Sequence, residues 1–217
     1  MEKLTVIRSV AAPLLLPNID TDIIAPMKRI LFHGDEIEKY GFEPLRFLDG
    51  DGDARVPNPE FPLNQERFRH AKILLCGENF GCGSSRENAP EAIAGMGIRC
   101  VIGTTFGGIF FKNCVNQGIL PIKVDKKDLT ELVALSEKGE ATTVDLVNRN
   151  IILATGHVLP FSVGDMQRYL LMEGLDNVGL TLEKKEKILA FEARDREERP
   201  WVYLTVEQEK QDTEDVL

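Results

Sequence analysis

Short apolar runs alternate with helix-like segments between residues 72 and 124. Three apolar runs, KILLC, IRCVIG and ILPIKV, begin at residues 72, 98 and 119. The segments between them, PEAIAGMG and FGGIFFKNCVNQG, have a helical pattern, and each ends at a glycine, Gly97 or Gly118, which is a common helix stop. This order of strand, helix, strand, helix and strand, with short connections, predicts an α/β fold with a parallel or mixed sheet and covering helices.

The starts of both helices carry polar residues that suit an N-cap. Asn88, three residues before Glu91, is predicted to cap the first helix, and Pro90 is tolerated in its first turn. Thr104 and Thr105 offer the corresponding cap for the second helix.

The flanking segments have other patterns. Residues 42–66 contain four prolines and a DGDGD run at 49–53, so we expect a loop that is ordered by contacts rather than regular structure. Two apolar runs within 145–153, separated by Asn148, Arg149 and Asn150, predict a β-hairpin. Helices are predicted at 161–173, ended by Gly174, and at 182–194.

The length and composition fit one domain. With 217 residues, 43% of them hydrophobic and 28% charged, the chain has the make-up of an ordinary soluble globular protein. We expect a single domain over residues 1–203, with a C-terminal helical extension, and an acidic, mobile tail over 204–217. The sequence has no run of about 18 apolar residues, which a membrane span requires. Lys3, Arg8 and nearby prolines interrupt the N-terminal apolar patch, so we expect no signal peptide, no membrane partner and a cytoplasmic location.

Charge and cysteine usage narrow the choice of partners. The formal net charge of −9 at pH 7 argues against nucleic acid, which is bound by clustered Lys and Arg. The four cysteines, Cys76, Cys82, Cys100 and Cys114, include no CxxC pair. Their spacing gives no self-contained zinc or iron-sulfur site, so a metal used in the chemistry would have to be held by another chain.

The loop from Gly77 to Pro90, GENFGCGSSRENAP, carries the strongest signal for chemistry. It follows an apolar strand-like run and leads into a predicted helix. Its glycines let the backbone adopt positive φ angles and approach a ligand closely. Ser84, Ser85 and Arg86 add two hydroxyls and a planar cation that can hold a carboxylate by two parallel hydrogen bonds. The loop is therefore predicted to bind an anionic small molecule.

Several segments share a characteristic order and spacing. They are NIDTDIIAP at 18–26, FLDGDGDARVPNPEFPLN at 47–64, ENFGCGSSRE at 78–87, FGGIFFKNCVNQGILPI at 106–122 and MEGLDNVGLTL at 172–182. In this arrangement the chain resembles the 3-isopropylmalate dehydratase small-subunit family, which is similar to the mobile swivel domain of aconitase. The resemblance covers most of the chain and implies the swivelling β/β/α fold of the aconitase C-terminal domain.

The resemblance also implies a function. A member of this family would be one subunit of a heteromeric hydro-lyase of leucine biosynthesis, which dehydrates 2-isopropylmalate to 2-isopropylmaleate and rehydrates it to 3-isopropylmalate. A larger partner subunit would carry a [4Fe-4S] cluster whose iron acts as a Lewis acid on the leaving hydroxyl, and this chain alone would bind no cofactor. The isolated chain is therefore expected to be inactive.

The resemblance assigns a role to each polar residue of the GSSR motif. Ser84, the first serine, would be the base that removes a proton from carbon. A serine hydroxyl is a poor base unless its alkoxide is stabilised, and backbone N–H groups of the loop and helix start, together with Arg86, would supply positive charge. Arg86 would also hold a substrate carboxylate, and Ser85 would donate to the same group. Where many relatives carry His after SSRE, this chain has Asn88.

A second set of candidates precedes this loop in the sequence. In the family pattern, Asp20, Thr21 and Asp22 would face the loop and bind substrate. Lys28 and Arg29 are candidates for a second carboxylate contact.

Structural roles compete with these functional ones. Ser84 and Glu87 could form a capping box at the helix start, and Asp20 and Asp22 could be turn and cap residues. Arg86, taken alone, could be an ordinary surface arginine.

Other functions also compete. A related hydro-lyase of the citramalate, homoaconitate or dimethylmalate type would have the same GSSR loop. A non-catalytic aconitase-like binding module is another possibility, although the intact Ser84 and Arg86 argue against it. A serine hydrolase would need a G-x-S-x-G nucleophile elbow, which this loop lacks.

Overall fold

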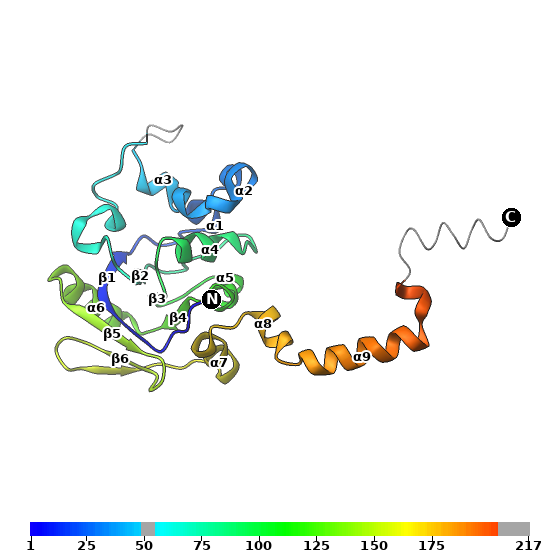
Figure 1. Cartoon of the computed structure of the whole chain (residues 1–217). Helices are drawn as coiled ribbons and strands as arrows, with labels where there is room; N and C mark the ends of the chain where they lie inside the picture. Colours follow the sequence, from blue (N-terminus) through cyan, green and yellow to red (C-terminus); the bar gives the residue numbers. More distant parts are fainter. Residues whose placement is uncertain (49–54, 204–217) are drawn as a thin grey trace. The chain divides into compact units, whose positions relative to one another are not determined.

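The computed structural model describes residues 1–48 and 55–203 of the chain (Figure 1). The DGDGD run at 49–53 and the acidic tail at 204–217 therefore lie outside the described residues. The chain divides into two compact units, Met1–Asp176 and the residues from Asn177 onward, and each has its own architecture.

The first unit is built on a mixed β-sheet. Within the described residues the strand order is β4-β3-β2-β1-β5-β6-β7. Neighbours from β4 to β1 are parallel, and neighbours from β1 to β7 are antiparallel. The predicted mixed sheet and the β-α-β-α-β order over residues 72–124 are confirmed. The strands are β1 Val6–Leu14, β2 Ile73–Cys76, β3 Cys100–Gly103, β4 Leu120–Lys123, β5 Ala141–Asp145, β6 Asn150–Ile152 and β7 Val158–Pro160.

The sheet changes from parallel to antiparallel at β1. Residues 6–10 of this strand pair with β5, and residues 11–14 pair with β2. Pro13 has no N–H to donate. It lies among the residues of β1 that pair with β2 but not with β5. Pro121 lies on β4 and Pro160 on β7, the two edge strands of the sheet. An edge strand tolerates a residue that lacks a backbone N–H.

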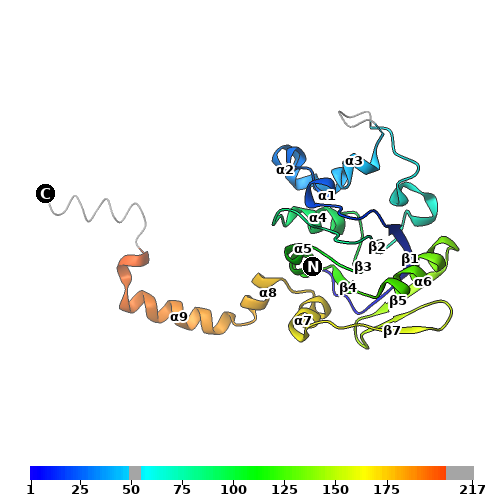
Figure 2. The ribbon, with the colours of Figure 1, turned by 180° about the vertical axis from the view of Figure 1, so that it is seen from behind.

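Helices cover the sheet and fill the long β1–β2 connection. Helices α1 to α4 gather on one side of the strands (Figure 1, Figure 2), whereas α6 packs on β1, β2 and β5. The expectation that residues 42–66 lack regular structure was wrong for α3 and η2. The helices are α1 Thr21–Ile24, α2 Met27–His33, α3 Glu43–Arg46, α4 Asn88–Gly95, α5 Gly108–Asn116 and α6 Lys126–Glu137, with 3-10 turns η1 Gly34–Tyr40, η2 Pro62–Asn64 and η3 Glu66–Phe68.

Burial of β2 shows that both faces of the parallel half are covered. All four residues of this strand are fully buried, as expected for a strand inside a layered α/β fold. Leu74 and Cys76 belong to the core cluster that also contains Phe80, Ile93 and Phe110. Alternate strand residues point to opposite faces, so Ile73 and Leu75 face the layer where α6 packs on this strand.

The helix stops follow the sequence, but the N-caps do not. Gly97 and Gly118 have φ angles of +90° and +72°, which confirms both predicted stops. Helix α4 begins at Asn88 itself and α5 at Gly108, and neither has a side-chain cap. The predicted caps at Asn88, Thr104 and Thr105 are therefore wrong, as is a capping box from Ser84. Asn88 instead donates to Glu91, and the Thr105 hydroxyl accepts the backbone N–H of Asn79.

The predicted hairpin is confirmed, and the predicted C-terminal helices are present with different bounds. β5 and β6 form the predicted hairpin, with Arg149 at a positive φ angle in its turn. Helix α7, Asp165–Glu173, ends at Gly174 as predicted but begins four residues later than expected. The helix predicted at 182–194 is wrong in its bounds, because the second unit contains α8 Asn177–Leu182, α9 Lys185–Glu198 and the turn η4 Pro200–Tyr203. None of the helices in the described part of the chain is long and apolar enough to cross a bilayer.

Candidate active site

The GSSR loop follows β2 and is hydrogen-bonded to the segment that follows β1. The backbone N–H of Gly77 donates to the carbonyl oxygen of Leu14 at 3.0 Å, and that of Gly81 donates to Ile19 at 2.7 Å. In the opposite direction, the N–H of Thr21 donates to the Cys82 carbonyl oxygen at 2.9 Å. The two segments therefore continue the parallel pairing of β1 and β2 beyond the ends of the strands.

The other side of the loop is bonded to the segment after β3. The N–H of Phe80 donates to the Thr105 carbonyl oxygen at 3.2 Å, and the N–H of Gly107 donates to that of Phe80 at 2.9 Å. The loop thus lies between its two neighbours at the carboxyl edge of the parallel strands. This edge is where α/β proteins usually bind ligands.

Glycine is required in the loop because aromatic and backbone atoms approach it closely. Gly81 has a φ angle of +70°, and a Cβ atom there would lie 2.2 Å from Cγ of Phe110. Gly107 has the same restriction, since its Cβ would lie 2.2 Å from the carbonyl oxygen of Gly81. The Phe80 ring packs edge-on against Phe110 with ring centroids 5.5 Å apart, and both side chains are buried. Packing therefore fixes the loop immediately before the serines.

Ser84 is exposed, and its hydroxyl faces Thr21. The two side-chain oxygens are 3.2 Å apart, and the Thr21 hydroxyl also lies 3.4 Å from the Ser84 carbonyl oxygen. Thr21 is only 1% exposed, so it lies beneath the serine rather than on the surface. Asp20 caps helix α1, because its Oδ1 accepts the N–H of Ile23 at 2.8 Å.

Arg86 forms an ion pair with Asp22 through Nη1 and Oδ1. The arginine side chain is 17% exposed and the aspartate 59%, so the pair lies at the surface. The backbone N–H of Arg86 donates to the Ser84 carbonyl oxygen at 2.9 Å. The structure therefore brings Asp20, Thr21 and Asp22 against the GSSR loop, with Ser85 exposed beside them.

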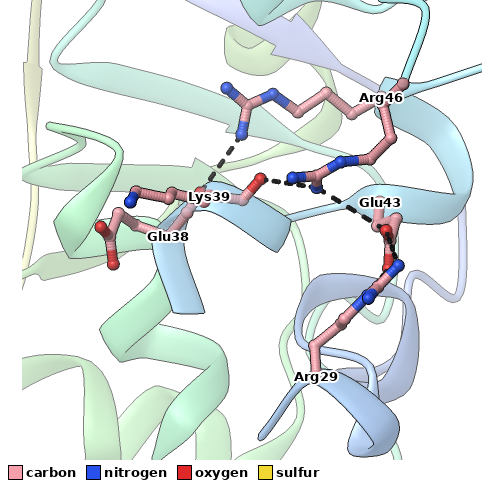
Figure 3. Close-up of polar contacts among 6 residues, drawn as sticks. Arg29, Glu38, Lys39, Glu43 and Arg46 are labelled. Carbon is pink, nitrogen blue, oxygen red and sulfur yellow. Dashed lines mark hydrogen bonds and ion pairs between the residues drawn. The ribbon is translucent and has the colours of Figure 1, made fainter. Parts of the chain in front are cut away.

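Arg29 is held by a carboxylate of its own chain (Figure 3). Its Nε and Nη2 donate to the two oxygens of Glu43 at 2.8 and 2.7 Å, and Arg55 lies 3.6 Å from the same carboxylate. The Arg29 and Glu43 side chains are 13% and 8% exposed. Lys28, its neighbour on α2, is exposed. Sequence reasoning missed Glu43, because nothing in a proline-rich segment 14 residues away marks it as the partner of Arg29.

The cysteines of this chain do not fit a [4Fe-4S] cluster, which is held by Cys thiolates. Cys76, Cys100 and Cys114 are buried, and burial raises the pKa of each thiol. Cys82 has partial exposure and lies in the loop. Among residues 1–48 and 55–203, no group of three or more His, Cys, Asp and Glu side chains could hold a metal ion.

Ser84 and Ser85 are both exposed. A hollow of about 420 Å³ lies between the end of β1 and Phe61, and one of about 450 Å³ lies between η1 and Arg69. Neither hollow is lined by the GSSR residues.

Comparison with known proteins gives the class to which this fold and site belong. Residues 1–127 match the family model of the aconitase C-terminal domain. Residues 177–204 match the family model of the C-terminal domain of the 3-isopropylmalate dehydratase small subunit. The chain is thus an α/β protein of the aconitase C-terminal-domain class.

Relatives define the family more narrowly. The chain is 45% identical over 209 residues to the 3-isopropylmalate dehydratase small subunit of Xanthobacter autotrophicus and 47% identical over 206 residues to that of Brucella canis. Each match covers 93% of this chain and 100% of the relative. The crystal structure of a 3-isopropylmalate dehydratase from Methanocaldococcus jannaschii is similar, with a TM-score of 0.62, 25% identity, and coverage of 86% of this chain and 99% of that one. The chain belongs to the 3-isopropylmalate dehydratase small-subunit family.

The contact between Gly81 and Phe110 predicts a large stability effect. Gly81→Ala should lower the free energy of unfolding by about 2–5 kcal/mol, because a left-handed backbone is unfavourable for alanine and the added methyl overpacks the core. Gly97→Ala is the matched control, since Gly97 also has a positive φ angle but has no atom within 4 Å of the added Cβ. That variant should lose only about 1–2 kcal/mol. Urea denaturation of the two purified variants measures the difference, and equal losses would contradict the packing argument.

The ion pair between Arg29 and Glu43 predicts that Arg29 stabilises the folded chain. Arg29→Ala should lower the free energy of unfolding by about 3–5 kcal/mol, because it leaves a buried carboxylate without its main partner. Lys28→Ala, the control on the same helix, should change it by about 0.5 kcal/mol or less because Lys28 is exposed. Thermal and urea unfolding test both. A stable Arg29→Ala protein would show that this pair does not hold α2.

Proposed function

We propose that this chain is the small subunit of a 3-isopropylmalate dehydratase, a hydro-lyase of leucine biosynthesis. The enzyme isomerises 2-isopropylmalate to 3-isopropylmalate through 2-isopropylmaleate. The full-length similarity to small subunits of that name supports this assignment. The observation that carries the proposal is the exposed Ser84 hydroxyl, 3.2 Å from the Thr21 hydroxyl and two residues before Arg86 in the loop at the carboxyl edge of the sheet.

Ser84 is the proposed base. As an alkoxide it takes the proton from the carbon next to a substrate carboxylate and becomes a hydroxyl again. The electron pair of the broken C–H bond forms the double bond of 2-isopropylmaleate as hydroxide leaves the adjacent carbon. In the hydration direction the Ser84 hydroxyl returns the proton to carbon. Backbone hydrogen bonds hold the loop on both sides of Ser84, and a base held in place favours proton transfer over a short distance.

Arg86 and Ser85 are the proposed ligands of that carboxylate. The guanidinium can bind two oxygens side by side, and Ser85 lies next to it on the exposed face. In the free chain Asp22 takes one of the guanidinium donors. A bound substrate carboxylate would replace Asp22 or share the guanidinium with it. Lys28, exposed on α2, is the proposed contact for the second carboxylate, while Arg29 acts through Glu43 by holding that helix.

The rest of the site is proposed to come from a larger partner subunit. The open face around Ser84 and the family's small-subunit name support an active site that is completed by another chain. The [4Fe-4S] cluster implied by the resemblance belongs to that partner, because the described cysteines of this chain do not suit it. All four cysteines are free, which supports a reducing cytoplasmic location.

The test is an anaerobic reconstitution of this chain with its large subunit, assayed for hydration of 2-isopropylmaleate. The wild-type complex should be active and either chain alone inactive. Ser84→Ala should lower kcat by about 10²- to 10⁴-fold, because the complex loses its base, while the subunits still associate. If the complex acts only on another hydroxy acid, the chain remains a hydro-lyase subunit but its assigned substrate changes. Turnover by the isolated chain, or unchanged turnover by the Ser84→Ala complex, would contradict the proposal.

Arg86 provides a separate prediction about substrate binding. Arg86→Lys keeps the charge but loses the planar pair of donors, so KM for 2-isopropylmaleate should rise by about 10- to 100-fold. Steady-state kinetics of the reconstituted complex measure this. Lys123→Arg, a conservative exchange on the edge strand β4, is the control and should leave KM unchanged. An unchanged KM in Arg86→Lys would remove Arg86 from the carboxylate site.

A further inference from the structure

Thr21 and Ser84 form a hydroxyl pair in which one member is buried and the other exposed. The Thr21 hydroxyl has two neighbours among the described hydrogen bonds, and both belong to Ser84: its Oγ at 3.2 Å and its carbonyl oxygen at 3.4 Å. Thr21 is held from below, because its backbone N–H donates to Cys82 and its carbonyl oxygen accepts the N–H of Ala25. These two bonds hold the backbone of Thr21 beside the GSSR loop.

The pair can approach closely because position 83 is glycine. Gly83 has a φ angle of +97°, and a Cβ atom at this position would lie 3.3 Å from the Thr21 hydroxyl oxygen. A side chain there would crowd the hydroxyl that faces Ser84. The glycine between Cys82 and Ser84 thus leaves room for the Thr21 hydroxyl.

The hydrogen bonds of this pair must rearrange when the Ser84 hydroxyl loses its proton. A hydroxyl has one proton to donate and two lone pairs to accept. In the neutral pair the Ser84 hydroxyl can donate to Thr21, while Thr21 donates to the Ser84 carbonyl oxygen. A Ser84 alkoxide can only accept, so the Thr21 proton must turn to it to keep the contact. The Ser84 carbonyl oxygen is not left unpaired by this rotation, because it still accepts the N–H of Arg86 at 2.9 Å.

We propose that Thr21 is a positioning residue whose hydroxyl donates a hydrogen bond to the Ser84 alkoxide and thereby makes Ser84 a usable base near neutral pH. This inference rests on the proposed function, since it concerns the base of that reaction. The bond stabilises only the deprotonated serine, so it lowers the pKa of Ser84. Because the donor is buried, water competes with it less than with an exposed hydroxyl. Thr21 acts through Ser84 and does not need to touch the substrate.

The experiment uses Thr21→Val and Thr21→Ser in the reconstituted complex with the large subunit. Valine has nearly the same shape but no hydroxyl, so the alkoxide loses its donor and the pKa of Ser84 rises. The rising limb of kcat against pH should then move about one to two units toward higher pH. At neutral pH, kcat should fall about 10- to 100-fold with little change in KM, the loss expected for a hydrogen bond to a charged group. Thr21→Ser keeps the hydroxyl and should restore most of kcat and the original pH profile.

Controls separate this inference from the proposed function. Complex formation by each variant is checked by size-exclusion chromatography, so that a folding or assembly defect is recognised. In a Ser84→Ala background, Thr21→Val should have no further effect on kcat, because its partner is absent. If Ser84→Ala lowers kcat as expected but Thr21→Val keeps the wild-type kcat and pH profile, the inference fails and the proposed function stands. If Thr21→Val and Thr21→Ser both lose activity and neither shifts the pH profile, Thr21 has only a structural role. That result would also overturn the inference. If Ser84→Ala keeps the wild-type kcat, the proposed base itself is wrong.

Discussion

Backbone hydrogen bonds between three neighbouring loops are the constraint on which the candidate site depends. The GSSR loop has no helix or strand of its own, yet it receives bonds from the segment after β1 and from the segment after β3. These bonds continue the parallel order of the strands below them. A change that separated the loops would therefore disturb Ser84, Thr21 and Arg86 together. The sheet thus sets the geometry of the loops that carry the candidate site residues.

Two kinds of packing reinforce this constraint from below and from the side. Beneath the loop, the Phe80, Phe106 and Phe110 rings pack on one another, and Gly81 rests against this cluster. At the side, the buried Glu43 carboxylate holds Arg29 of α2 next to the Asp20–Asp22 segment in the chain. The aromatic contacts are insensitive to charge, whereas the Arg29–Glu43 pair is not. One support of the site is therefore apolar and the other ionic.

The sequence predicts the parallel half of the sheet well because its signals are local. Apolar runs and the glycine stops at Gly97 and Gly118 identify β2 to β4 and the helices between them. The GSSR motif points to Ser84 and Arg86 for the same reason. The sequence does not predict β1. Its apolar run contains Pro13, and a proline within a run argues against a central strand. In the structure β1 changes partners along its length, and this change is not visible in the sequence. Likewise, the N-caps fail because hydroxyls such as that of Thr105 find partners in other loops. The Glu43 contact depends on the folded chain and has no signature in the sequence near it. The family pattern, in contrast, already predicts that Thr21 faces the GSSR loop, but not which atoms it contacts.

The uneven burial of the cysteines has a consequence for chemical labelling. Three thiols are sealed in the core with a raised pKa, whereas Cys82 has partial access to solvent and lies two residues from Ser84. Because a thiol reagent acts on accessible thiolate, it would modify the folded chain selectively at the loop that carries Ser84 and Arg86. Cys82 therefore offers a natural attachment point for a spectroscopic probe, one that would sense when another molecule covers this face.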